Sequence, residues 1–78
     1  MSATIKIIID VKNRRIISIY PETDEANYFA EVAETLLEES QRFGDFYAKF
    51  AAAAINRGYF PAANYDGPSG RLTLLLHD

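Results

Sequence analysis

The sequence contains no cysteine and a single histidine among its 78 residues. Without cysteine the chain has neither disulfide bonds nor thiolate-bound metal, and small secreted domains usually depend on such cross-links. We therefore expect a cytoplasmic location. No apolar run approaches the roughly 20 residues that a membrane-spanning helix requires, so no membrane partner is expected. A chain of this length holds one hydrophobic core, and residues 1–78 are predicted to form a single domain.

Negative charge is concentrated in the middle of the chain. The formal net charge is only −3, but residues 22–45 carry eight carboxylates against one arginine. Residues 1–21 carry four cations against one aspartate. The sequence therefore predicts an acidic region that follows a mildly basic N-terminal segment.

Apolar and polar residues alternate near the N-terminus, which is typical of half-buried strands. The pattern predicts a hairpin with strands at residues 4–11 and 15–20. Two connections fit: a two-residue turn at residues 13–14, or a three-residue loop at residues 12–14. We favour the three-residue loop because it keeps one face of the ribbon wholly apolar.

The loop length decides which isoleucines of the hairpin lie opposite each other. The favoured loop places Ile7 opposite Ile19 and Ile9 opposite Ile17. The other face of the ribbon then carries three apolar side chains: Ile8, Ile16 and Tyr20. Such a face can pair with a second copy of the chain, so a homodimer is an alternative expectation.

A strongly amphipathic helix is predicted to begin after Thr23. Threonine is a good N-cap, and the carboxylates of Asp24 and Glu25 favour the positive end of the helix dipole. A stripe with helical spacing follows that is apolar except for Ser40, made of Phe29, Val32, Ala33, Leu36, Leu37, Ser40 and Phe43.

Gly44 and Asp45 are predicted to separate this helix from a second one. Glycine disfavours a helix interior, and aspartate caps a new helix start. The second helix is expected over residues 46–57 and is predicted to bury some of Phe46, Phe50, Ala53 and Ala54.

The last part of the sequence is predicted to be a loop followed by one strand. Residues 59–70 are rich in turn-forming residues. Residues 71–77 alternate, with Leu72, Leu74 and Leu76 on one face. The predicted fold class is α+β: a three-stranded sheet made of the β-hairpin and the C-terminal strand, with two helices on one face, in the order β-β-α-α-β.

No set of residues has the spacing of a catalytic site. His77 lies next to the C-terminus and has no identifiable nucleophile or orienting partner. Residues 66–70 lack the lysine and the following helix of a phosphate-binding loop. The carboxylates of the acidic region have no histidine among them to complete a metal site. We expect no enzyme activity, no catalytic residue, no metal and no cofactor.

Binding to a protein is expected instead of direct binding to nucleic acid. Lys12, Arg14 and Arg15 supply three cations next to an acidic region that would repel phosphates. Acidic helices and exposed aromatic loops, in contrast, suit protein recognition. The candidate partner-binding residues are Glu31, Glu34, Glu38, Glu39, Asp45, Tyr59 and Tyr65. The plainer alternatives are an ordinary solvated helix face and an arrangement in which Tyr59 and Phe60 tuck under the edge of the sheet.

In size, absence of cysteine, acidic balance and lack of a catalytic site, the chain resembles the small proteins of phages and mobile elements, among them the anti-CRISPR inhibitors. Such inhibitors are mostly non-enzymatic, and several are acidic and block a nucleic-acid-binding surface of their target. The resemblance implies binding to a CRISPR effector complex through Glu31, Glu34, Glu38 and Glu39. The predicted function is a non-catalytic inhibitor or regulator that acts as an acidic decoy for nucleic acid. The alternative is a small structural protein that works as a homo-oligomer.

Overall fold

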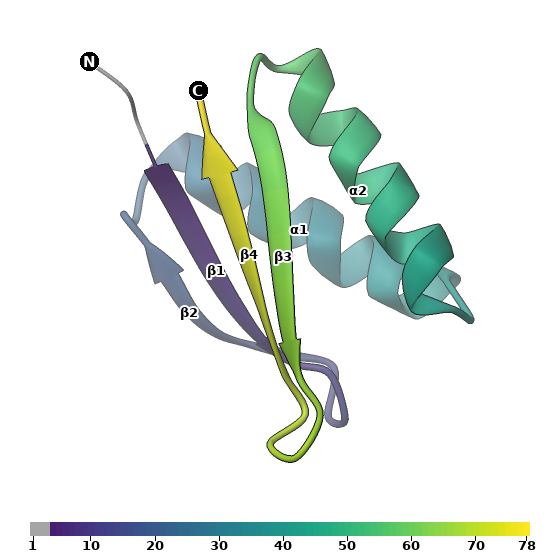
Figure 1. The fold of residues 1–78 in the computed structure, drawn as a ribbon. Helices are drawn as coiled ribbons and strands as arrows, with labels where there is room; N and C mark the ends of the chain where they lie inside the picture. The colour runs from purple at the N-terminus through teal and green to yellow at the C-terminus, as the bar shows by residue number, and fades with distance from the viewer. Residues whose placement is uncertain (1–3) are drawn as a thin grey trace.

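Two β-hairpins form one antiparallel sheet, and two consecutive helices connect them (Figure 1). The computed structural model describes residues 4–78. The strands lie in the order β2-β1-β4-β3, so the first and last strands of the chain are neighbours in the centre of the sheet. Both helices lie on one face of the sheet. The elements are β1 (Thr4–Asp10), β2 (Arg15–Tyr20), α1 (Asp24–Glu39), α2 (Phe43–Asn56), β3 (Phe60–Asp66) and β4 (Arg71–His77).

The predicted α+β class and the two helices are confirmed, but the sheet has four strands and not three. The segment predicted as a loop at residues 59–70 contains β3, which pairs with β4 along its whole length. None of the residues of β3 is buried, so the strand lacks the apolar alternation that marks the others. It also contains Pro61, which an outer strand tolerates because one of its edges needs no hydrogen bonds.

A β-bulge in the first hairpin changes part of the predicted register. Ile7 lies opposite Ile19, as predicted. Ile9, however, lies opposite Ile16, whereas the prediction placed it opposite Ile17. The extra residue of a bulge is left out of the paired ladder, and Ile17 is 46% exposed. Ile16 consequently packs against the core instead of facing outward.

The turn of this hairpin spans residues 11–14 and is one residue longer than predicted. The backbone N–H of Arg14 donates to the carbonyl oxygen of Val11 at 3.3 Å. The side-chain amide of Asn13 donates to the carboxylate of Asp10 at 2.8 Å. Arg14 closes the turn with a φ of 53°, in the left-handed region that non-glycine residues rarely adopt.

Thr23 caps the first helix as predicted, since its Oγ1 accepts a hydrogen bond from the backbone N–H of Ala26 at 3.2 Å. The break between the helices falls earlier than predicted, because α1 ends at Glu39 and α2 begins at Phe43. Gly44 therefore lies in the first turn of α2, where backbone N–H groups have no intrahelical acceptor and glycine interrupts no hydrogen bond. Neither helix, in the part of the chain described, is long and apolar enough to cross a membrane.

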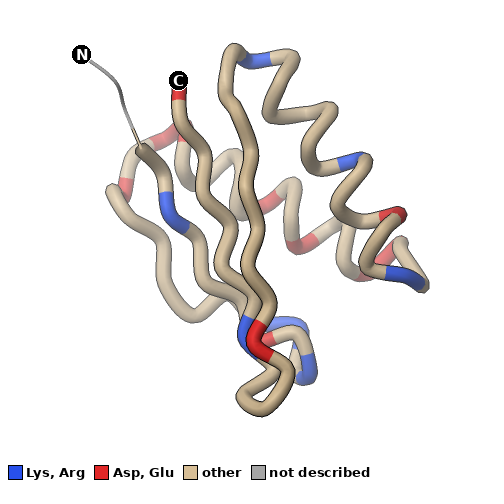
Figure 2. The backbone as a smooth tube through the Cα atoms, viewed as in Figure 1, with Lys and Arg blue, Asp and Glu red and all other residues tan. Residues whose placement is uncertain are grey.

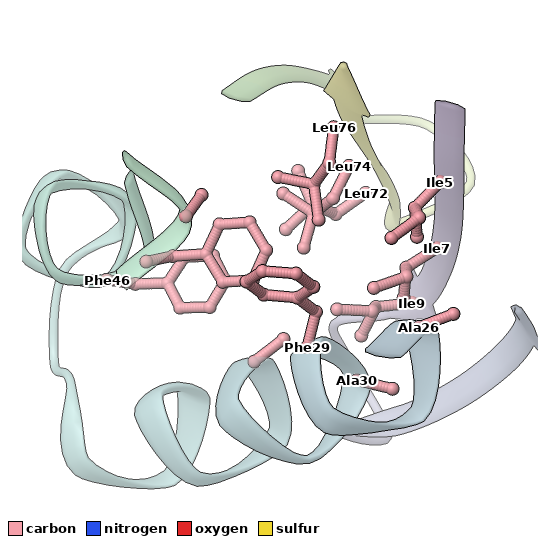
Figure 3. Close-up of a cluster of buried hydrophobic side chains, with 13 residues drawn as sticks. Ile5, Ile7, Ile9, Ala26, Phe29, Ala30, Phe46, Leu72, Leu74 and Leu76 are labelled. Carbon is pink, nitrogen blue, oxygen red and sulfur yellow. The ribbon is translucent and has the colours of Figure 1, made fainter. Parts of the chain in front are cut away.

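The core lies between the sheet and the helices (Figure 3). Alternate residues of the two central strands point into it: Ile5, Ile7 and Ile9 from β1, and Leu72, Leu74 and Leu76 from β4. The helices contribute three phenylalanines, Phe29, Phe46 and Phe50, and four alanines, Ala26, Ala30, Ala33 and Ala54. The alanines let the helix backbones approach the sheet closely, while the aromatic rings fill the remaining space.

Candidate binding surfaces

Three glutamates of α1 lie on one exposed stripe of the helix. Glu31, Glu34 and Glu38 are spaced by three and four residues, which places their side chains on the same side of an α-helix. Together with Thr35 they line a shallow depression, and all four residues are exposed. We call these four residues the acidic face. Figure 2 shows the acidic positions along α1, with no basic position between them.

No cation among residues 4–78 forms an ion pair with the carboxylates of the acidic face. In the part of the chain that the structure describes, the one ion pair joins Arg57 to Glu25 at 3.3 Å. Glu25 belongs to the first turn of α1 and lies more than one helical turn before Glu31. The helix contains no lysine or arginine that could pair within it. The carboxylates therefore combine into a local negative potential at the surface.

The two other predicted acidic residues lie where the helices join. Glu39 is the last residue of α1, and Asp45 lies in the first turn of α2. Both are exposed. A carboxylate in the first turn stabilises its helix by interacting with the positive end of the dipole, so Asp45 has a structural role of its own. The structure groups three of the five predicted carboxylates on one stripe.

The two predicted tyrosines lie near opposite ends of β3. Tyr59 directly precedes the strand, and Tyr65 is its penultimate residue, which separates them by roughly 20 Å at about 3.3 Å per residue. Tyr59 is half-buried, and its ring lies edge-to-face at 5.3 Å from that of Phe29. Burial is the main cause that raises the pKa of the Tyr59 hydroxyl, and the nearby carboxylate of Glu25 raises it further. The position of Tyr59 matches the alternative in which it tucks under the edge of the sheet, but Phe60, which was expected to tuck in with it, is mostly exposed.

Tyr65 belongs to an aromatic cluster with the beginning of α2. Its ring lies 6.5 Å from that of Phe43, which in turn stacks on Tyr47 at 6.0 Å. Tyr65 and Phe43 are each about half exposed, at 50% and 47%. Phe43 was predicted to continue the apolar stripe of the first helix, but the earlier helix break moves it to the first position of α2. Sequence spacing did not reveal this cluster because Tyr65 is distant in the chain from Phe43 and Tyr47.

None of the helices and strands that the structure describes covers the face of the sheet opposite the helices (Figure 1). Tyr20 and Phe60 are 71% and 70% exposed, and Ile8 and Leu75 are half-buried. Of the three apolar residues predicted on this face, Ile8 and Tyr20 are present. The third, Ile16, is turned inward by the bulge. We call Ile8, Tyr20, Phe60 and Leu75 the outer sheet face.

Charges of opposite sign alternate across the hairpin end of the sheet. Asp10 lies opposite both Arg15 and Arg71, and Asp66 also lies opposite Arg71. Opposite charges at facing positions stabilise strand pairing. The hydrogen bond from the Asn13 side chain lowers the pKa of Asp10, which keeps this carboxylate ionised. The hairpin tip is therefore less basic than its sequence suggests.

His77 lies at the exposed end of β4, where its Nδ1 is 3.2 Å from Oγ1 of Thr4 on β1. This hydrogen bond joins the two central strands near their ends. Over residues 4–78, no three histidine, aspartate or glutamate side chains come close enough together to hold a metal ion.

Comparison with known proteins gives no match: no protein-family model, no curated protein and no solved structure is significantly similar to the chain. No residue role can therefore be transferred from a relative to the acidic face or to the outer sheet face.

Proposed function

We propose that the protein is a non-catalytic inhibitor or regulator that binds a protein partner through the acidic face of α1. One observation carries this proposal, namely the alignment of Glu31, Glu34 and Glu38 on an exposed stripe without a neutralising cation. The carboxylates follow one another at about 4.5 to 6 Å along the helix axis. A line of negative charge of this kind is complementary to a basic groove and speeds association with it.

A basic groove is typical of proteins that handle nucleic acid, since such proteins neutralise phosphates with lysine and arginine. The partner we propose is therefore a nucleic-acid-binding protein of the same cytoplasm, with the acidic face in the place of its nucleic acid. A CRISPR effector complex, which the resemblance to anti-CRISPR inhibitors implies, is the narrower form of the proposal. That narrower form is tested by measuring how strongly a CRISPR system interferes with a plasmid in the presence and in the absence of this protein.

Charge reversal on the acidic face is the direct test. A partner captured from a bacterial host and identified by mass spectrometry is first purified. Its association rate with the wild type and with Glu34→Lys is then measured at about 50 and 200 mM salt, where screening lengths differ. We expect Glu34→Lys to slow association by about tenfold at the lower salt concentration and to flatten the salt dependence.

Glu22→Lys is the matched control, because it makes the same change in net charge at an exposed residue outside the acidic face. It should leave the association rate close to that of the wild type. Equal slowing by both variants would show that only overall charge matters, and unchanged binding of Glu34→Lys would overturn the proposal.

The outer sheet face supports a second candidate function, that of a small structural protein assembled as a homo-oligomer. Tyr20 and Phe60 are large and mostly exposed, and no other element of the described chain covers this face. Lys6 lies opposite Tyr20 on one side and Leu75 on the other, so a cation interrupts the apolar surface. Light scattering after size exclusion separates the candidates: a dimer at micromolar concentration that Tyr20→Glu dissociates would favour assembly.

A further inference from the structure

A cavity of about 380 Å³ opens where the hairpin turn, the junction of the helices and the end of β3 meet. This volume is within the range of small-molecule sites, about 300 to 1,000 Å³. Its walls are mainly apolar: Val11, Leu37, Phe43, Phe46, Tyr65 and Leu72. The polar lining consists of Arg14, Ser40, Gln41 and Arg42, with no carboxylate among the described lining residues. The acidic face therefore does not contribute to this cavity.

The two arginines of the cavity come from distant parts of the chain. Arg14 ends the hairpin turn, and Arg42 lies between the helices. Neither forms an ion pair with any residue that the structure describes. Arg15, the neighbour of Arg14, lies opposite Asp10 in the strand register and does not line the cavity. The cavity thus brings two uncompensated cations together in a chain whose net charge is −3.

Arg14 has a backbone conformation that costs energy for an arginine. Its φ of 53° lies in the left-handed region, which glycine or asparagine adopts more readily. Unfavourable backbone conformations are often kept where the side chain is needed for binding. This placement of Arg14 at the cavity is consistent with such a need.

Further hydrogen-bond donors are available at the same place. The Ser40 hydroxyl oxygen is buried and has no hydrogen-bond partner within the described part of the chain. Helix α2 begins at Phe43, and its N-cap residue Arg42 provides no side-chain cap. The positive end of this helix begins at the cavity-lining residues Arg42 and Phe43 and favours negative charge there, in addition to its interaction with the first-turn carboxylate of Asp45.

We propose that this cavity binds a small amphipathic anion, a carboxylic acid carried on an apolar chain or ring. The carboxylate pairs with Arg14 and Arg42, and the apolar part lies against Leu37, Phe43 and Phe46. Charge-assisted hydrogen bonds from arginine to a carboxylate fix the orientation, while the apolar walls remove the rest of the ligand from water.

Octanoate and octanol are a matched pair of probes, since they share the chain length and differ in charge. Titration of each is followed by amide chemical shifts in heteronuclear NMR spectra. We expect saturable octanoate binding, with shifts confined to the residues around the cavity and affinity about tenfold higher than for octanol. Equal affinity for octanol, or shifts without saturation, would overturn the proposal, because the cavity would then be an unselective apolar surface.

Two variants and a control assign the role of the arginines. Arg14→Gly removes the cation and suits the left-handed backbone, so it should melt no lower than the wild type and yet bind octanoate about tenfold more weakly. Arg42→Gln should weaken octanoate binding to a similar extent. Lys49→Gln, which removes an exposed cation of α2 that does not line the cavity, should leave binding unchanged. Octanoate affinity that survives both arginine changes would contradict the assignment.

Discussion

Tyr47 of the second helix forms a hydrogen bond with Pro61 of the outer strand β3: its hydroxyl donates to the backbone carbonyl oxygen of Pro61 at 3.3 Å. Strand β3 also pairs with β4 along its length and packs against α2 on one face. The strand that sequence patterns did not predict is thus stabilised partly by a tyrosine from a helix.

Removal of the Tyr47 hydroxyl is expected to destabilise the fold moderately. Tyr47→Phe should lower the free energy of unfolding by about 0.5 to 1.5 kcal/mol, the net contribution of a typical hydrogen bond. Urea denaturation measures the loss. Tyr65→Phe is the matched control, since the hydroxyl of Tyr65 has no hydrogen bond among the residues described and the ring is half exposed. An equal loss in both variants would mean that the bond to Pro61 does not contribute.

The cap at Thr23 gives a second stability prediction. Thr23→Ala removes the oxygen that accepts from Ala26 and should cost about 1 kcal/mol in the free energy of unfolding. Thr35→Ala makes the same chemical change at an exposed position inside α1, where alanine is the better helix former. Thermal unfolding followed by circular dichroism should therefore show a lower melting temperature for Thr23→Ala alone.

Local signals in the sequence predicted the parts of the fold that depend on neighbouring residues. The cap at Thr23 and the buried strand faces through Ile7 and Leu74 are examples, because capping and alternation are fixed within a few residues. The stripe from Glu31 to Glu38 was also predictable, since helical spacing alone brings these carboxylates together.

Features that depend on distant residues were not predictable in the same way. Two adjacent isoleucines, Ile16 and Ile17, keep an apolar face in either register, so the pattern does not reveal the bulge. The burial of Tyr59 depends on Phe29, and the cavity depends on Arg14 and Arg42 meeting across the fold. Such tertiary contacts do not produce a periodic pattern of residues in the sequence.

Substitution of Phe50 is expected to destabilise the hydrophobic core strongly. It is fully buried and its ring lies 6.3 Å from that of Phe29 and 5.9 Å from that of Phe46. Phe50→Ala should cost about 3 to 5 kcal/mol, which approaches the whole stability of a small domain, about 5 kcal/mol. We expect the variant to lose its cooperative melting transition.

Phe60→Ala removes the same atoms from a ring that is 70% exposed on the outer sheet face. It should change the free energy of unfolding by no more than about 0.5 kcal/mol. Similar losses for the two phenylalanine variants would contradict the arrangement of the core between the helices and the sheet.

Asp10 links stability to pH through its bond with Asn13. The hydrogen bond from the Asn13 side chain is the main cause that lowers the pKa of Asp10 in the folded protein. A carboxylate whose folded-state pKa is lowered stabilises the fold above its unfolded-state pKa, about 3.9 for aspartate. This contribution is lost as the pH falls through the folded-state pKa. Asn13→Ala should therefore raise the pKa of Asp10 and flatten the fall of stability with decreasing pH.

Carbon-detected NMR titration of the Asp10 carboxyl group, over a range from about pH 2 to 6 that brackets its ordinary value, measures the pKa directly. Asn64→Ala is the control, because Asn64 is an exposed asparagine of β3 that lies opposite Thr73 and not near Asp10 in the strand register. The pKa of Asp10 should move upward in Asn13→Ala and stay in place in Asn64→Ala. An unchanged pKa in Asn13→Ala would show that the facing cation Arg71 and the backbone N–H groups of the turn, rather than the Asn13 side chain, hold the carboxylate in its ionised form.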